Sequence, residues 1–184
     1  MSQREADLYP PVHDYLELRF ADRVRPIRGE LRALSAITAT AGGSGTGIWS
    51  KPDLCFAALW RHKYGTTWHL DLHGFEVKPK GRCSADAVHE ALNHTSHVHF
   101  AHLVWHKPDW SDEDRACSDL LDLCRRFGVG LITLKDPTAA DTFAVRLSAE
   151  RHAPLGDAVD EFIETRLAPE DRELLNSWLA ELRP

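Results

Sequence analysis

Apolar residues recur along this chain at two different spacings, and the spacing predicts where helices and strands lie. Over residues 2–20 they fall on one helical face, which predicts an N-terminal helix (Leu8, Val12, Tyr15 and Leu16). Ser2 and Glu5 have the spacing of a capping box at its start. Pro10 and Pro11 mean that this helix either begins near Pro11 or is kinked there.

The rest of the chain alternates strand-like and helix-like segments. Strands are predicted over Leu31–Thr40, 53–60, 67–78, His99–His106, Val129–Leu134 and Phe143–Leu147. Helices are predicted over Ala85–His97, Cys117–Phe127 and two C-terminal segments, the second of which starts at Pro169. This order of elements predicts an α/β fold, with a central mixed sheet flanked by helices.

We assign residues 1–150 to one domain and residues 151–184 to a helical hairpin that packs on the same domain. Each C-terminal helix keeps one apolar face. Packing on the core is the simpler interpretation of those faces, and a homodimer or protein-partner surface is the alternative.

Composition limits the function classes. The 184 residues are 43% apolar, which is typical of a soluble globule, and no apolar run approaches a membrane span. The N-terminus lacks a signal-peptide core, and the four cysteines form no CxxC pair, so we expect a reduced, cytoplasmic setting. The net charge, 22 − 28 = −6, argues against a protein that coats nucleic acid. Residues 150–184 hold nine acidic and four basic side chains, so the first 149 residues are near −1.

Charged residues interrupt two of the apolar strands. Asp53 opens the run that ends at Trp60, while Glu76 and Lys78 point to the same face of the next run because strand side chains alternate with period two. Burying such charges is unfavourable unless they are paired or bind a metal. If the two strands pair, Asp53 and Glu76 can converge on one divalent cation beside Lys78. The alternative is an ordinary Glu76–Lys78 charge pair on a half-exposed strand.

The segments Pro52-Asp53 and Glu76-Val77-Lys78, in this order of helices and strands, resemble the PD-(D/E)xK nuclease superfamily. The resemblance covers roughly residues 3–134 and implies a restriction-endonuclease-like αβββαβ core with a C-terminal helical extension. It implies a divalent-metal-dependent endonuclease of the defence, restriction or repair type that hydrolyses phosphodiester bonds, with DNA favoured over RNA.

The resemblance also implies roles for individual residues. Asp53 and Glu76 would bind Mg²⁺ or Mn²⁺, which prefer such oxygen ligands, together with the carbonyl of Val77 and an acidic residue from the first helix. Glu5 is the first candidate for that acidic residue and Glu17 the second. Lys78 would orient the attacking water or stabilise developing charge. Glu90 and His94, on the helix after Lys78, are candidate accessory residues.

Basic residues offer candidate phosphate contacts. Five arginines lie between residues 19 and 32, and arginine suits phosphate, although a solvated connector is the simpler interpretation. The candidates for phosphate binding are Arg25, Arg28, Lys80 and Arg82.

Other patterns point to competing functions. The glycine-rich segment 41–47 is not followed by a helix, so we interpret it as a turn rather than a nucleotide-binding loop. Six histidines between His89 and His106 raise the alternative of a zinc site, but they lack the HExxH arrangement. A catalytically silent nuclease-fold module that binds nucleic acid or a protein partner is the main alternative function.

Overall fold

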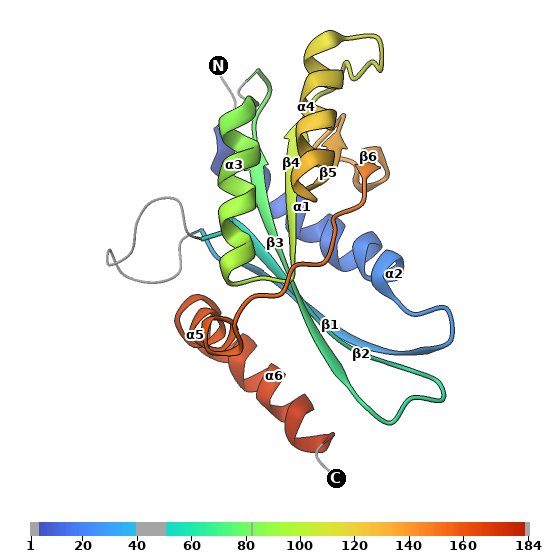
Figure 1. Ribbon diagram of the computed structural model, residues 1–184, viewed down its shortest axis with the longest axis vertical. Coiled ribbons are helices and arrows are strands. Elements are labelled where there is room, and N and C mark those ends of the chain that lie inside the picture. The colour runs from blue at the N-terminus through green and yellow to red at the C-terminus, as the bar shows by residue number, and fades with distance from the viewer. Residues whose placement is uncertain (1–3, 40–50, 82, 183–184) are drawn as a thin grey trace.

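Six strands form one open sheet, with the spatial order β1-β2-β3-β4-β5-β6. The computed structural model describes residues 4–39, 51–81 and 83–182 (Figure 1). The strands are β1 Gly29–Ile37, β2 Leu54–His62, β3 His69–Lys78, β4 Phe100–His106, β5 Gly130–Leu134 and β6 Phe143–Leu147. The helical segments are η1 Glu5–Leu8, α1 Tyr9–Tyr15, η2 Leu16–Phe20, α2 Ala21–Val24, α3 Ala85–Asn93, η3 His94–Ser96, α4 Arg115–Phe127, η4 Ala140–Thr142, α5 Gly156–Arg166 and α6 Pro169–Glu181.

The sheet is mixed because its connections are of two kinds. The strands β1, β2 and β3 pair antiparallel. The pairs β3–β4 and β4–β5 are parallel, which requires the crossovers that α3 and α4 provide. The last strand, β6, pairs antiparallel with β5. The predicted α/β class with a mixed sheet is therefore correct.

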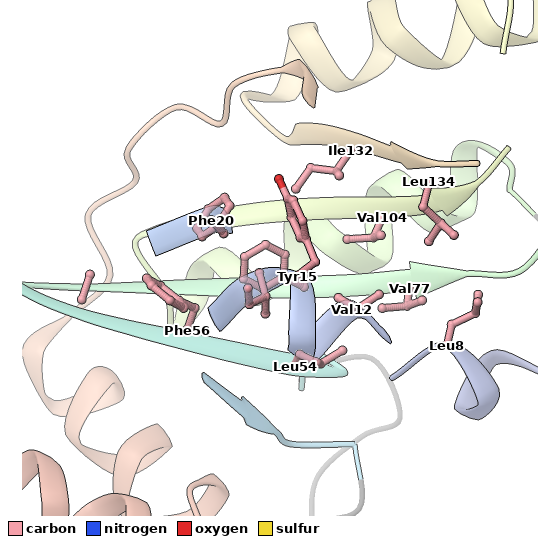
Figure 2. Close-up of a cluster of buried hydrophobic side chains, with 13 residues drawn as sticks. Leu8, Val12, Tyr15, Phe20, Leu54, Phe56, Val77, Val104, Ile132 and Leu134 are labelled. Atoms are coloured by element: carbon pink, nitrogen blue, oxygen red, sulfur yellow. The ribbon is translucent and has the colours of Figure 1, made fainter. Parts of the chain in front are cut away.

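The N-terminal helical segment covers one face of the sheet. Its buried side chains meet the alternate residues of β2 to β5 that point to the same face (Figure 2). Phe20 is central to this packing, because its ring contacts Phe56 and Phe75 edge-on, with centroids 5.3 and 5.2 Å apart. Burial of this many apolar side chains fixes the position of residues 5–20 on the sheet.

The opposite face is covered by two pairs of helices that lie on different strands. The helices α3 and α4 pack on β4 and β5 through residues that include Val88, Leu103 and Leu131. The helices α5 and α6 pack on β1 and β2, with Phe162 and Leu175 buried there. Within the described ranges, no helix has both the length and the apolar character needed to cross a membrane.

Most predicted element boundaries agree with the structure within two residues, and the exceptions have identifiable causes. The first strand is predicted to reach Thr40 but ends at Ile37, because the N–H groups of Thr38 and Ala39 both donate to the Asp53 carbonyl, at 2.8 and 2.9 Å. The N-terminal helical segment begins at Glu5, just after Arg4, whose N–H donates to Oδ2 of Asp7 at 3.1 Å. It runs on to Val24 instead of ending at residue 20. The predicted cap residue Ser2 and the glycine-rich segment 41–47 lie outside the described residues.

The two prolines belong to the first turn of α1 rather than to a kink in its interior. This helix begins at Tyr9, after the single 3-10 turn η1. Pro10 and Pro11 therefore occupy positions where an intrahelical N–H donor is not required.

Replacing Gly130 with alanine is expected to destabilise the protein by about 1–3 kcal/mol through overpacking. A Cβ at Gly130 would lie 2.5 Å from Nδ1 of His102 and 3.0 Å from the backbone N of Ala149. Thermal unfolding measures the loss. Gly156→Ala is the control, since nothing lies within 4 Å of its added Cβ and alanine favours the helix. Equal stability of the two variants would contradict the close packing of β4 against β5.

Candidate functional site

Carboxylates from three separate segments converge at the end of β3. Glu5 comes from η1, Asp53 precedes β2 and Glu76 lies in β3, and one carboxylate oxygen from each lies within 4.8 Å of the others. They line a pocket of about 260 Å³. The full lining consists of Glu5, Tyr9, Ala39, Lys51, Asp53, Glu76, Lys78, Glu90 and His94.

Hydrogen bonds fix both the backbone and the side chain of Asp53. Its N–H donates to the carbonyl of Phe75 at 2.9 Å, which fixes the start of β2 against β3. Its Oδ2 accepts the N–H of Val77 at 2.8 Å, and its Oδ1 accepts the hydroxyl of Tyr9, also at 2.8 Å. The carboxylate is thus oriented before any ligand arrives.

Tyr9 links two of the acidic residues. Its hydroxyl lies 2.8 Å from Oδ1 of Asp53 and 3.1 Å from Oε1 of Glu5. A hydroxyl carries one proton and donates to one carboxylate at a time. The second contact is therefore favourable only when a carboxyl group is protonated or a cation lies nearby.

Lys78 lies among three carboxylates. Its Nζ is 2.6 Å from Oε1 of Glu76, 2.6 Å from Oε2 of Glu90 and 3.5 Å from Oε2 of Glu5. Burial lowers the pKa of Lys78, but attraction to Glu76 and hydrogen bonds to Glu76 and Glu90 outweigh it, so the net pKa is raised. Lys78 is therefore an ammonium ion at neutral pH, not a proton acceptor.

The pocket holds more negative than positive charge. Its four carboxylates and two lysines give a formal charge of −4 + 2 = −2 when all are ionised. Burial and repulsion from Glu76 raise the pKa of Asp53 to about 7. Burial also raises the pKa of Glu76, although Lys78 opposes that rise. Without a bound cation, the pocket therefore takes up protons near neutral pH.

His94 contacts the oxygen of Glu76 that Lys78 does not contact. Its Nε2 lies 3.0 Å from Oε2 of Glu76, and the side chain is 1% exposed. Burial lowers the pKa of His94 to about 4, so the ring is neutral at pH 7 and its Nε2 shares a hydrogen bond with Oε2 of Glu76. Within the described part of the chain, its buried Nδ1 has no hydrogen-bond partner.

The donor set fits a hard divalent cation. Neighbouring oxygens in an octahedral Mg²⁺ site lie about 3 Å apart and opposite ones about 4 Å apart, so the 4.8 Å limit on Glu5, Asp53 and Glu76 requires only small side-chain shifts. The N–H of Val77 points to Asp53, and because the N–H and C=O groups of a strand residue face the same side, its carbonyl does too. The formal charge of −2 is balanced by one such cation.

Not every predicted site residue lies at this pocket. Glu17 is exposed and lies 3.9 Å from Nε2 of His13, and it does not line the pocket. Lys80 is exposed in the turn after β3, where its charge lowers the pKa of His106 behind the larger effect of burial. Arg82 lies outside the described residues.

Two candidate phosphate-binding arginines lie far from the carboxylates. Arg25 and Arg28 precede Gly29, which pairs with His62, whereas Asp53 precedes Leu54, which pairs with Ile37. They are thus at the opposite end of the β1–β2 ladder, about 30 Å away at roughly 3.3 Å per residue. Neither arginine can contact a phosphate bound at the carboxylates.

The histidines that raised the zinc alternative make separate structural contacts. His94 bonds to Glu76, His99 accepts the N–H of Leu72 and His102 lies 3.1 Å from the ring of His73. Among the described residues, Glu5, Asp53 and Glu76 form the only group of three potential ligands close enough to share a metal. The geometry therefore favours oxygen ligation over a histidine site.

A second, larger pocket lies on the face covered by the N-terminal helical segment. It has a volume of about 440 Å³, and Phe20, Phe100 and the His73–His102 pair are among its lining residues. Burial lowers the pKa of His102 to about 3 and that of His73 well below its usual range, with the neighbouring His102 adding to the second shift. No described residue of its lining is a carboxylate, and His73 Nδ1 and His102 Nε2 are paired with each other at 3.1 Å. The smaller carboxylate pocket is therefore the candidate site.

Sequence reasoning missed Tyr9 and Lys51, which both line the carboxylate pocket. Tyr9 follows Glu5 by four residues, a spacing that puts both on one helical face and is a usable signal. Lys51 precedes Asp53 by two residues, and its Nζ donates to the Ala39 carbonyl at 2.7 Å. That contact depends on how two distant segments meet, which no local pattern indicates.

Comparisons with models of known protein families and with curated proteins find no match for this chain.

Proposed function

We propose that this protein is a divalent-metal-dependent nuclease that hydrolyses phosphodiester bonds at the carboxylate pocket, with DNA as the preferred substrate. The observation that carries the proposal is the convergence of Glu5, Asp53 and Glu76 within 4.8 Å, beside an ammonium group supplied by Lys78. The order of elements through β4 and the segments Pro52-Asp53 and Glu76-Val77-Lys78 support a restriction-endonuclease-like core.

Each residue has a distinct part in this proposal. Glu5, Asp53, Glu76 and the Val77 carbonyl would hold Mg²⁺ or Mn²⁺, which supplies Lewis-acid stabilisation and an activated water. Lys78, as an ammonium ion, stabilises the charge that develops on the phosphate. Tyr9 orients Asp53 by hydrogen bonding at 2.8 Å, and its hydroxyl lies 3.1 Å from Glu5.

His94 and Glu90 are positioning residues in this account. His94 holds one oxygen of Glu76 and Lys78 the other, so the carboxylate is fixed from both sides. Glu90 holds Lys78 through a contact of 2.6 Å between its Oε2 and the Nζ of Lys78. These contacts keep the ligands and the ammonium group in one geometry, which favours catalysis by a preorganised site.

Mg²⁺ affinity is expected to weaken about tenfold between pH 8 and pH 6, because a metal ligand has to lose its proton before it binds. The group responsible is Asp53, whose pKa is raised to about 7. Isothermal titration at both pH values measures the change. An affinity that is the same at pH 6 and pH 8 would contradict the assignment of Asp53 as a ligand.

Cleavage of plasmid, linear and single-stranded DNA and of RNA, each with EDTA, Mg²⁺ or Mn²⁺, tests the proposed function. We expect DNA to be cut with either metal and to remain intact with EDTA. No cutting of any substrate at high protein concentration with Mn²⁺ would overturn the proposal. Nucleic-acid binding without cutting would favour the silent nuclease-fold module instead.

A further inference from the structure

Positive charge collects at the end of the sheet that lies farthest from the carboxylate pocket. We call this region the basic tip and define it as residues 22–30 and 60–69, which include the α2–β1 connection and the β2–β3 hairpin. It contains five Arg or Lys residues and two acidic residues, a net charge of 5 − 2 = +3. Because the whole chain carries −6, the remaining residues carry −6 − 3 = −9.

The two segments of the basic tip form one surface. The N–H of Lys63 donates to the carbonyl of Arg28 at 2.8 Å, and Gly29 pairs with His62. Both segments lie together at the lower right of the molecule, away from the N-terminus (Figure 1). The backbones of Arg28 and Lys63, far apart in sequence, therefore lie side by side.

The basic side chains of the tip differ in how they are paired. Arg25 lies 3.6 Å from Asp22, and Arg61 pairs with Glu30. Arg28 and Lys63 are exposed, and neither forms an ion pair within residues 4–39, 51–81 and 83–182. Their charges are available to an external anion.

Aromatic rings contact two cations of the basic tip. The guanidinium of Arg61 lies 5.0 Å from the ring centre of Trp68, and Nζ of Lys63 lies 5.2 Å from that of Tyr64, which is 84% exposed. Cations that meet phosphates, next to exposed rings that meet bases, suit a nucleic-acid strand better than an acidic protein or a lipid surface.

We propose that the basic tip binds the phosphodiester backbone of nucleic acid at a distance from the scissile bond. The proposal rests on the proposed function in one respect, namely that the strand held here is the one cut at the carboxylate pocket. The two surfaces are separated by the nine residues of β2, which span about 30 Å at roughly 3.3 Å per residue. A nucleic acid that contacts both must span that distance, which is about nine base pairs of DNA.

The binding test compares wild type with the double variant Arg28→Glu/Lys63→Glu. Fluorescence anisotropy with labelled single-stranded and duplex DNA of about 30 nucleotides, in EDTA and at several salt concentrations, reports affinity without cleavage. We expect at least tenfold weaker binding and a salt dependence reduced by about two phosphate contacts. Whichever form, single-stranded or duplex, is bound more weakly by the double variant is the form that the basic tip binds.

The double variant Arg115→Glu/Arg126→Glu is the matched control, because it makes the same charge change on the exposed surface of α4. It is expected to bind DNA within about twofold of wild type. An equal loss in both double variants would show a general charge effect and overturn the proposal. Unchanged binding by Arg28→Glu/Lys63→Glu, or loss of binding to anionic vesicles alone, would overturn it as well.

Substrate length separates this proposal from the proposed function. For cleavage of 30-bp duplexes, Arg28→Glu/Lys63→Glu should raise KM about tenfold and leave kcat unchanged, whereas 6-bp duplexes, too short to reach the tip, should be unaffected. If wild type binds DNA through the basic tip but cuts no substrate, the proposed nuclease function is wrong and the proposed binding by the tip is supported. If wild type cuts both lengths and Arg28→Glu/Lys63→Glu cuts them equally well, the proposed binding by the basic tip is wrong and the proposed nuclease function is supported.

Discussion

Replacing Lys78 with alanine is expected to lower the rate of DNA cleavage by about 10²–10³-fold and to leave Mg²⁺ binding intact. The ammonium group is held 2.6 Å from both Glu76 and Glu90, at the edge of the carboxylate cluster. In the proposed reaction, its removal takes away the charge that would stabilise the transition state. It also removes a positive charge that competes with the metal, so Mg²⁺ affinity should stay the same or rise.

Lys107→Ala is the matched control for Lys78→Ala. Lys107 is 15% exposed, compared with 13% for Lys78, and it is paired with the carboxylates of Asp109 and Asp114, as Lys78 is paired with three. It does not line the pocket. For Lys107→Ala, single-turnover cleavage should give the wild-type rate, and isothermal titration with Mg²⁺ should give the wild-type affinity. A Lys78→Ala variant that keeps a third or more of the wild-type rate would contradict the role assigned to Lys78.

Replacing Asp53 with asparagine is expected to abolish Mg²⁺ binding and cleavage, and at pH 8 to stabilise the metal-free protein by roughly 2–4 kcal/mol. The sign follows from the raised pKa of Asp53, about 7 in the folded protein against an ordinary value near 4. The folded state then binds more protons than the unfolded state, so wild-type stability falls as pH rises from about 4 to about 7 and stays low above it. Asparagine removes that cost and still accepts the N–H of Val77.

Thermal unfolding at pH 4 and pH 8, with and without Mg²⁺, measures this effect. The gain of Asp53→Asn should be present at pH 8 and absent at pH 4, and Mg²⁺ should raise the Tm of wild type only. Asp71→Asn is the control, since Asp71 is equally buried but is paired with Arg151 and Trp60, so its replacement should destabilise. If Asp53→Asn were less stable than wild type at pH 8, the claim that the ionised Asp53 carboxylate destabilises the metal-free protein would be wrong.

The fold was predictable from the sequence where each element carries its own periodic pattern. The strand Phe143–Leu147 agrees at both ends. The N-terminal helical segment was predicted too short, because its last turns depend on the contact of Phe20 with the sheet rather than on local pattern. The end of β1 depends on hydrogen bonds to Asp53, which only the pairing of distant segments determines.

The candidate site was predictable in part. The meeting of Asp53 with Glu76 and Lys78 follows from strand periodicity once the two strands pair. The choice of Glu5 over Glu17 rested on the family resemblance, and the structure brings Glu5 to the pocket and leaves Glu17 exposed. The remote position of Arg28 could not be predicted, because sequence proximity to the first strand does not say which end of it lies near Asp53.

The most direct test of the central claim is to locate the metal. A crystal soaked in Mn²⁺ would be measured for anomalous scattering. We expect one strong peak bonded to oxygens of Glu5, Asp53 and Glu76 at about 2.0–2.4 Å, and no such peak in Asp53→Asn. A fully occupied Mn²⁺ elsewhere, with none in the carboxylate pocket, would contradict the account.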